Sequence, residues 1–203
     1  MDALLKALVE HVKAAPYGAR VVGYQATGLK TQEWYHWSMN TPELGDYSAP
    51  MQAAWRGWLK ERYTGDVGQL RARWHQPEVD FTTAVIPSRN ARYGGEATFR
   101  NPATEQPVID FHRFWSWIMA DTIGHYCKTL RDLGAPSVGA FYGYSAEFAD
   151  LAEDAGHLGL PSPPQVAPDY MMAPTSYYRR GLDGGQALLR SPRAGEGRAG
   201  LVP

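Results

Sequence analysis

Cysteine is almost absent from this chain of 203 residues, in which Cys127 is the only one. A single cysteine excludes a disulfide within the chain and any zinc site built on several cysteines. The residues around Cys127 have the pattern of a helical turn, so we interpret this side chain as a buried structural thiol rather than a nucleophile.

An excess of charge of one sign is also lacking. The chain has 20 Lys and Arg against 21 Asp and Glu, which excludes a broad basic surface for nucleic acid or for an anionic membrane. No run of about 18 apolar residues is present, and the first residues do not resemble a secretion signal. We therefore expect a cytoplasmic protein with neither a nucleic-acid nor a membrane partner.

Several motifs that carry chemistry are missing too. The sequence contains no GxGxxG or Walker-type phosphate loop and no GxSxG elbow of a serine hydrolase. The histidines, among them His36, His75 and His112, show no metal-ligand spacing such as HExxH. We expect no metal ion and no cofactor.

Hydrophobic periodicity predicts alternating helices and strands, and hence an α/β fold with a parallel sheet. Residues 75–107, with two possible short strands at 79–86 and 96–99, form a long excursion, and residues 190–203 have the composition of a flexible tail. Helices are predicted at 3–14, 49–63, 67–74, 108–133 and 149–158, and buried strands at 21–25, 137–143 and 168–174.

Polar and aromatic side chains follow each predicted strand. In parallel α/β folds the residues after the strands gather at one edge of the sheet, where function is usually found. Amides, hydroxyls and aromatic rings suit a neutral polyol, so we expect a small saccharide as the ligand. The candidate substrate-binding residues are Gln25, Gln32, Trp34, His36, Tyr142, Tyr144, Tyr178 and Arg179.

Two carboxylates accompany this set, Glu33 after the first strand and Glu147 after the second. Cleavage of a glycosidic bond needs one protonated and one ionised carboxyl group on either side of the bond. Trp34 beside Glu33 is expected to raise the pKa of the Glu33 carboxyl by desolvation. The residues alone leave a second interpretation open, in which Glu33 is a solvated loop acid next to ordinary core.

Other prominent side chains have structural interpretations. We interpret Asp110 as a first-turn acid of the long helix, favoured by the helix dipole. Four tryptophans at helical spacing are interpreted as core or helix-packing residues: Trp55, Trp58, Trp115 and Trp117.

Five segments together resemble a known family. The segments are VVGYQATGLKTQEWYHW, DYSAPMQAAWRGWLKERYTGDVGQLRARW, IDFHRFWSWIMADTI, VGAFYGYSAEF and PDYMMAPTSYYRRGLDGG. In this order they resemble the central part of clan A glycoside hydrolases, especially family 42-type β-galactosidases, over roughly residues 1–189. The helical module at residues 54–63 and 70–74 is the most specific part of the likeness.

The resemblance implies a partial (β/α)₈ TIM-barrel-like fold with parallel strands, corresponding to about strands 4 to 6. Residues 1–189 would then form a truncated catalytic domain, with 75–107 as an insertion. The resemblance also implies a retaining glycosidase that cleaves terminal β-galactosides, with Glu33 as the acid/base. Gln32 stands where the family more often has Asn, and an amide there donates to the sugar 2-hydroxyl.

The likeness has gaps, because neither the first three barrel strands nor the segment of the family nucleophile has a counterpart in this chain. Glu147 is the best substitute nucleophile, with Asp110 and Asp183 in reserve. Two alternatives are a catalytically inactive carbohydrate-binding remnant and a fragment of a larger glycosidase. An incomplete barrel exposes apolar edges, which predicts a homo-oligomer, a dimer or higher.

Overall fold

The structure is a computed structural model of residues 1–203, and it describes residues 1–29, 32, 34, 36, 45–93, 100–141, 168–172 and 200–201. The chain divides into two compact units. Unit 1 comprises Met1–Trp37 together with Ser116–Pro203, and unit 2 comprises Ser38–Trp115.

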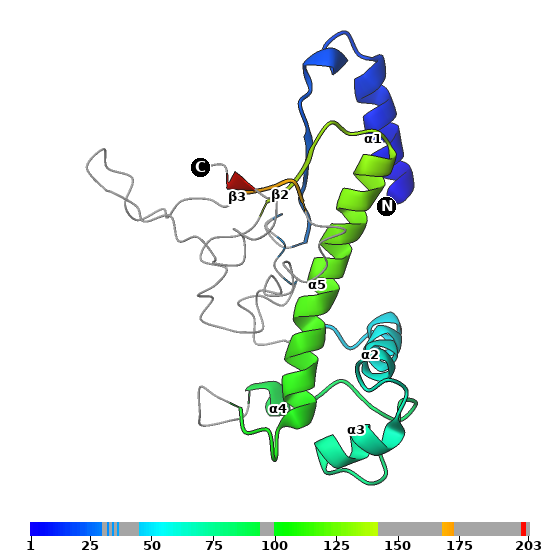
Figure 1. The fold of residues 1–203 in the computed structure, drawn as a ribbon, viewed down its shortest axis with the longest axis vertical. Helices are drawn as coiled ribbons and strands as arrows, with labels where there is room; N and C mark the ends of the chain where they lie inside the picture. The colour runs from blue at the N-terminus through cyan, green and yellow to red at the C-terminus, as the bar shows by residue number, and fades with distance from the viewer. Residues whose placement is uncertain are drawn as a thin grey trace, which may run out of the picture. The chain divides into compact units, whose positions relative to one another are not determined.

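Helices dominate the described residues (Figure 1). The four helices predicted within these residues are confirmed, with their ends shifted by no more than two positions. The helices are α1 (Asp2–Ala14), η1 (Gly18–Arg20), α2 (Ala49–Arg62), α3 (Val67–Trp74), α4 (Arg89–Tyr93) and α5 (Gln106–Asp132).

Four short parallel strands form one sheet in the order β1-β2-β3-β4. Strand β1 pairs with β2 from Tyr24↔Val138 to Ala26↔Ala140, and Phe141 of β2 pairs with Met172 of β3. The strands are β1 (Tyr24–Ala26), β2 (Val138–Phe141), β3 (Tyr170–Met172) and β4 (Gly200–Leu201).

The predicted fold class, a partial TIM-barrel-like α/β fold, is wrong. The strands contain only two to four residues, whereas the helices reach 27 residues in α5. The chain between β1 and β2 is also no single barrel crossover, because its residues 38–115 form a separate compact unit. The periodicity identified the helices and strands but did not show this division.

Two strand predictions need a further correction. The first strand begins at Tyr24 rather than Val21, because Val21 N–H bonds back to Gly18 and Val22 is 82% exposed. Residues 79–86 contain no strand, since Asp80 organises a turn with Thr82 and Thr83. The predicted elements at 96–99 and 149–158 lie outside the described residues, and two residues of the predicted tail form β4.

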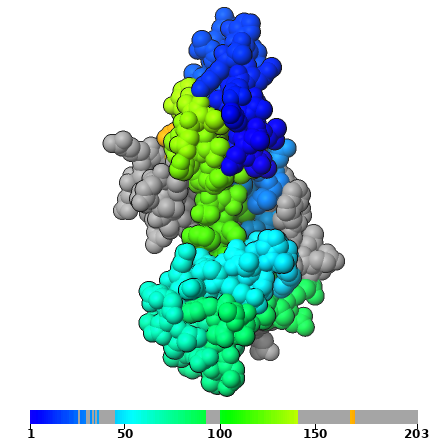
Figure 2. Space-filling model, turned by 90° about the vertical axis from the view of Figure 1, so that its right-hand side faces the viewer, coloured from blue at the N-terminus to red at the C-terminus, as the bar shows by residue number. Residues whose placement is uncertain are grey.

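In unit 1, α1 runs beside the C-terminal half of α5 in the same direction (Figures 1 and 2). Asp2 pairs with His125 at 2.8 Å, and Lys13 Nζ donates to the carbonyl of Leu133 at 2.5 Å. Between these polar ends lies an apolar core of buried residues from α1, the turn after β1, α5 and β2: Val9, Trp34, Met119, Ala120, Ile123, Cys127, Leu130, Val138 and Ala140.

The interpretation of Cys127 as a buried structural thiol is confirmed. Its side chain is fully buried in this core, and burial raises the pKa of the thiol to about 11. The thiolate that a nucleophile requires is therefore disfavoured.

Unit 2 is built on helices with well-formed ends. Ser48 caps α2 through a hydrogen bond from Met51 N–H, and Asp66 caps α3 by accepting from Gly68 and Gln69. The helix α3 ends at His75, whose φ of 55° places it in the left-handed region. These caps explain why two short helices form where the sequence predicts them.

The tryptophan predictions hold in part. Trp55 and Trp115 are buried in unit 2, and Trp58 stacks on Trp55 with ring centroids 5.7 Å apart. Trp117 is 39% exposed, so it is not a core residue, and its interpretation as a helix-packing residue stays a prediction. None of the helices within the described residues is long and apolar enough to cross a membrane.

Candidate functional site

Strands β1, β2 and β3 end side by side at one edge of the sheet. The register pairs Ala26 with Ala140 and Phe141 with Met172. Because the strands are parallel, the chain leaves the sheet at this edge three times. Each exit is the point in the sequence after which the candidate site residues follow.

Close packing fixes the middle of this sheet. Gly139 of β2 lies under the ring of Tyr170 from β3, and a Cβ at Gly139 would stand only 2.1 Å from Tyr170 Cε2. Gln25 pairs with Gly139 across β1 and β2, and its side chain is exposed. Gln25 therefore lies in a paired strand and is exposed to solvent, and its role in substrate binding stays a prediction.

The turn after β1 is backbone-bonded and strained. The N–H of Trp34 donates to the carbonyl of Gly28 at 3.1 Å, and the N–H of Gln32 donates to the carbonyl of Leu29 at 3.2 Å. Leu29, Gln32 and Trp34 have φ values of 59°, 63° and 61°, in the left-handed region that side chains other than glycine rarely adopt. Such strained residues cluster at functional sites, where the surrounding fold must maintain them.

Trp34 anchors this turn in the core of unit 1. Its ring packs over Gly28 and meets the ring of Tyr126 edge-on, with centroids 5.3 Å apart. The side chain is only 2% exposed, so the structure does not offer its ring faces for stacking on a sugar. Trp34 instead gives the turn a fixed, apolar floor.

The remaining predicted site residues divide into two groups. Gln32 and His36 both lie within two positions of Trp34 in the sequence. Gln32 is exposed to solvent, whereas His36 is buried. The predicted catalytic and binding residues Glu33, Glu147, Tyr142, Tyr144, Tyr178 and Arg179 lie outside the described residues. Their roles stay predictions.

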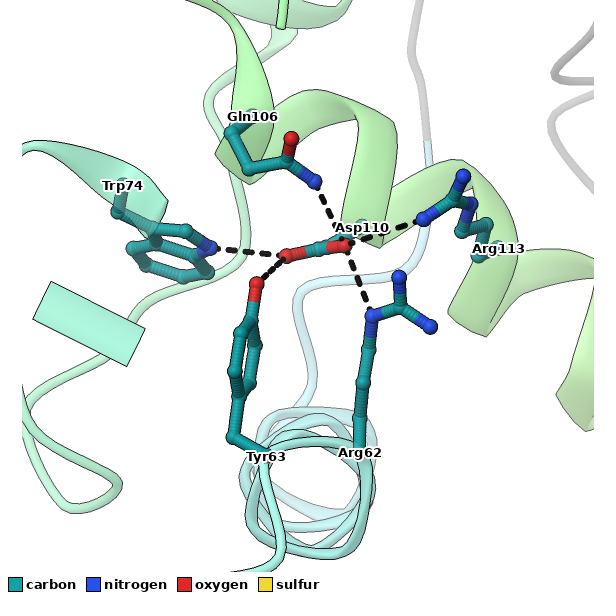
Figure 3. Close-up of polar contacts among 6 residues, drawn as sticks. All are labelled: Arg62, Tyr63, Trp74, Gln106, Asp110 and Arg113. Carbon is teal, nitrogen blue, oxygen red and sulfur yellow. Dashed lines mark hydrogen bonds and ion pairs between the residues drawn. The ribbon is translucent and has the colours of Figure 1, made fainter. Parts of the chain in front are cut away.

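Unit 2 contains a second polar cluster, centred on Asp110 (Figure 3). The Asp110 carboxylate is fully buried, and its Oδ2 accepts from Tyr63 Oη at 2.5 Å and from Trp74 Nε1 at 2.9 Å. Burial and the bond to this carboxylate raise the pKa of Tyr63 to about 12. The phenol is therefore kept protonated as a hydrogen-bond donor.

The other oxygen of Asp110 is equally occupied. Oδ1 accepts from Gln106 Nε2 and from Arg62 Nε, both at 3.0 Å, and Arg113 adds a second positive charge at 3.9 Å. A carboxylate with four donors has no lone pair directed to a substrate. Asp110 is thus a structural hub and is excluded as the reserve nucleophile.

The first-turn interpretation of Asp110 is also wrong, because α5 begins at Gln106 and places Asp110 one turn further into the helix. The hydrogen-bonded cluster around Asp110 was not predicted from the sequence, although the sequence contains one signal for it. Tyr63 and Trp74 both belong to the helical module, and buried phenol and indole groups need an acceptor. Asp110 is the acid that supplies it.

Comparisons with known proteins add no assignment. No protein-family model matches this chain, no curated protein matches it, and no solved structure matches it. Among the residues that the structure describes, no group of three or more His, Cys, Asp or Glu could hold a metal ion.

Proposed function

We propose that this chain is a retaining glycoside hydrolase that cleaves terminal β-galactosides, with Glu33 as the acid/base. The observation that carries the proposal is the shared edge at which β1, β2 and β3 end, since Glu33 follows β1 and Glu147 follows β2. This support does not depend on a barrel. It requires only neighbouring parallel strands.

The spacing of the strands suits the chemistry. Paired strands lie about 4.8 Å apart, and the two carboxyl groups of a retaining glycosidase lie about 5 to 5.5 Å apart. Segments that leave β1 and β2 therefore start side by side. Glu147 is the proposed nucleophile because it follows β2, the strand that pairs with β1.

The strained turn supports the role of Glu33. Hydrogen bonds from the N–H groups of Gln32 and Trp34 hold the residues on both sides of Glu33 in the sequence, and the second of these residues, Trp34, is buried. An apolar neighbour raises the pKa of a carboxyl group and so keeps it protonated for the first step.

In the proposed reaction Glu33 donates a proton to the glycosidic oxygen while Glu147 attacks the anomeric carbon. Glu33 then accepts a proton from the water that hydrolyses the galactosyl-enzyme, which restores both carboxyl groups. The proposal needs no metal ion and no cofactor. The residues that would bind the small saccharide are Gln25, Gln32, His36, Tyr142, Tyr144, Tyr178 and Arg179.

Hydrolysis of a chromogenic β-galactoside by the wild type, Glu33→Gln and Glu147→Gln tests this assignment. Both substitutions should lower kcat by about 100-fold or more for a substrate with a poor leaving group. The loss of kcat/KM in Glu33→Gln should be much smaller with a dinitrophenyl leaving group, because kcat/KM reports the first step and that group needs no proton. Unchanged turnover in Glu33→Gln would refute its acid/base role, and Glu61→Gln on the exposed side of α2 is the matched control.

Azide separates the two carboxylates by the product it forms. In a Glu33→Ala variant azide replaces water in the second step and gives the β-galactosyl azide. In a Glu147→Ala variant azide replaces the nucleophile and gives the α-galactosyl azide. The reverse pattern would exchange the two roles.

A carbohydrate-binding protein without hydrolytic activity, either a remnant or a fragment of a larger glycosidase, is the second candidate. One observation favours it. Asp110, the one reserve nucleophile within the described residues, already accepts hydrogen bonds from four side chains and cannot attack a sugar. No turnover by the wild type, combined with a rise in Tm in the presence of galactose, would support this candidate.

We also propose that the protein is cytoplasmic and self-associates. The support for self-association is the exposure of Met1, Leu4 and Leu8 along α1, which are 69%, 68% and 47% exposed. The single, buried Cys127 suits a reducing compartment. Light scattering at several concentrations tests self-association, and a strict monomer would refute it.

A further inference from the structure

A shallow groove of about 520 Å³ lies within unit 2, between α2, α3 and the turn that follows α3. Arg56 and Lys60 contribute to it from α2, and Arg71 contributes from α3. Arg56 and Lys60 are four positions apart on one helix, so their side chains lie on the same face. Three cations therefore line one concave surface.

The two arginines are positioned by the backbone of this turn. Arg71 Nε donates to the carbonyl of Val79 at 2.9 Å, and Arg56 Nε donates to the carbonyl of Ala84 at 3.0 Å. Each guanidinium is thus fixed through Nε, which leaves its two terminal NH₂ groups as donors. Such fixed donors lose little freedom when they bind an anion.

These cations are not neutralised by the surrounding chain. Among the residues described here, no ion pair within 4.0 Å joins Arg56, Lys60 or Arg71 to a carboxylate. By contrast, Arg62 and Arg100 each pair with an acid within 3.0 Å. Within the part of the chain that the structure describes, the three cations of the groove therefore have no ion-pair partner.

Asp80 is the one acid among the described residues that line the groove, and its Oδ1 accepts hydrogen bonds within its own turn. It accepts from Thr82 N, Thr82 Oγ1 and Thr83 N at 2.6, 2.7 and 2.9 Å. The nearby Asp66 is similarly occupied, because its carboxylate caps α3 and also binds the Gln69 amide. Three cations against the carboxylates of Asp80 and Asp66 leave a net positive charge at the groove, which attracts an anion.

The groove also has an apolar side formed by Val67 and Phe81. Phe81 is only partly buried, so part of its surface is open to a ligand. The volume lies in the range of about 300 to 1,000 Å³ that is usual for small-molecule sites. We propose that this groove binds an organic phosphate monoester, with the phosphate against Arg56, Lys60 and Arg71 and the organic group against Phe81.

This inference does not rest on the proposed glycosidase activity. The groove belongs entirely to unit 2, and none of its residues is among the proposed catalytic or substrate-binding residues. Loss of one function therefore leaves the other testable.

Calorimetric titration of the full chain with phenyl phosphate, at constant ionic strength, tests the proposal. We expect saturable binding that is tighter than that of inorganic phosphate, and no binding of phenol. Lys60→Gln and Arg71→Gln should each weaken the affinity for phenyl phosphate about tenfold, since each removes a charged donor. Absence of saturable binding by the wild type would overturn the proposal.

Arg73→Gln is the matched control, because Arg73 lies on the same helix as Arg71, is exposed and does not line the groove. The affinity of Arg73→Gln for phenyl phosphate should equal that of the wild type. An equal loss of affinity in Lys60→Gln, Arg71→Gln and Arg73→Gln would show non-specific charge attraction and overturn the site. Lys60 is exposed and its side chain makes no hydrogen bond to any described residue, so Lys60→Gln should fold normally. Circular dichroism checks the fold of this variant.

The comparison of the two ligands tests Phe81. Equal affinities of the wild type for phenyl phosphate and inorganic phosphate would overturn the role of Phe81.

Discussion

Tyr63 donates a 2.5 Å hydrogen bond to the fully buried carboxylate of Asp110, and this contact joins the end of α2 to α5 (Figure 3). Trp74, the last residue of α3, donates to the same oxygen at 2.9 Å. Three helices of unit 2 therefore meet at one acid. A buried carboxylate is stable only while such donors and charges compensate it.

Replacing Asp110 by alanine is expected to destabilise the protein strongly. The substitution leaves the Tyr63 hydroxyl and the Trp74 indole N–H buried without an acceptor, and each such loss costs about 1 to 3 kcal/mol. We expect the free energy of unfolding to fall by about 3 to 5 kcal/mol. Urea denaturation followed by circular dichroism measures this. Asp121→Ala, an exposed acid on the same helix, should change it by less than about 0.5 kcal/mol.

The raised pKa of Tyr63 predicts a loss of stability at alkaline pH. The folded-state pKa of about 12 lies above the ordinary tyrosine pKa of 10.0, so the folded protein retains this proton to a higher pH than the unfolded chain does. The contribution is fully present below pH 10 and is lost as the pH rises towards 12. Tyr63→Phe should remove this component, so the difference in stability between wild type and variant should shrink over that interval. A constant difference would contradict the assignment.

Local signals predicted the helices of this chain well. The apolar periodicity predicted α2, α3 and α5, and the structure adds the N-caps Ser48 and Asp66 at the starts of α2 and α3. The division into two units could not be predicted in this way, because it depends on which apolar faces meet. The apolar stripe of α5 contributes buried residues to both units. Phe111 is buried in unit 2, and Ile123 is buried in the core of unit 1.

The candidate site shows the same limit. Parallel strands were expected at three places, and their register brings the three strand ends together. The sequence left open whether Trp34 binds a sugar or belongs to ordinary core, because an indole in a loop has the same sequence pattern whether it faces solvent or core. Only its contacts with Gly28 and Tyr126 distinguish the two.

Gly139→Ala is expected to disturb the sheet through Tyr170. A Cβ at this position would stand 2.1 Å from the Tyr170 ring, so the ring must move, at a cost of about 1 to 3 kcal/mol. In a double-mutant cycle with Tyr170→Ala the two losses should not add, because removal of the ring removes the clash. Additive losses would show that the ring is not the cause.

Gly57→Ala provides the matched control for that substitution. Gly57 lies inside α2, and a Cβ there would meet nothing within 4 Å. Alanine should therefore stabilise the protein by about 0.5 to 1 kcal/mol through its higher helix propensity. Thermal unfolding of both variants should thus show shifts of Tm in opposite directions.

Trp34→Ala separates an anchoring role from a sugar-binding role for this indole. As an anchor, Trp34 fills the core beside Tyr126 and holds a turn in which its own φ is 61°. Its removal should lower the free energy of unfolding by about 3 to 5 kcal/mol, and the loss should be the same with and without galactose. Trp117→Ala, which removes an indole that is 39% exposed, should cost at most about 2 kcal/mol. A small loss in Trp34→Ala, together with loss of stabilisation by galactose, would instead show that the ring turns out of the core to bind sugar.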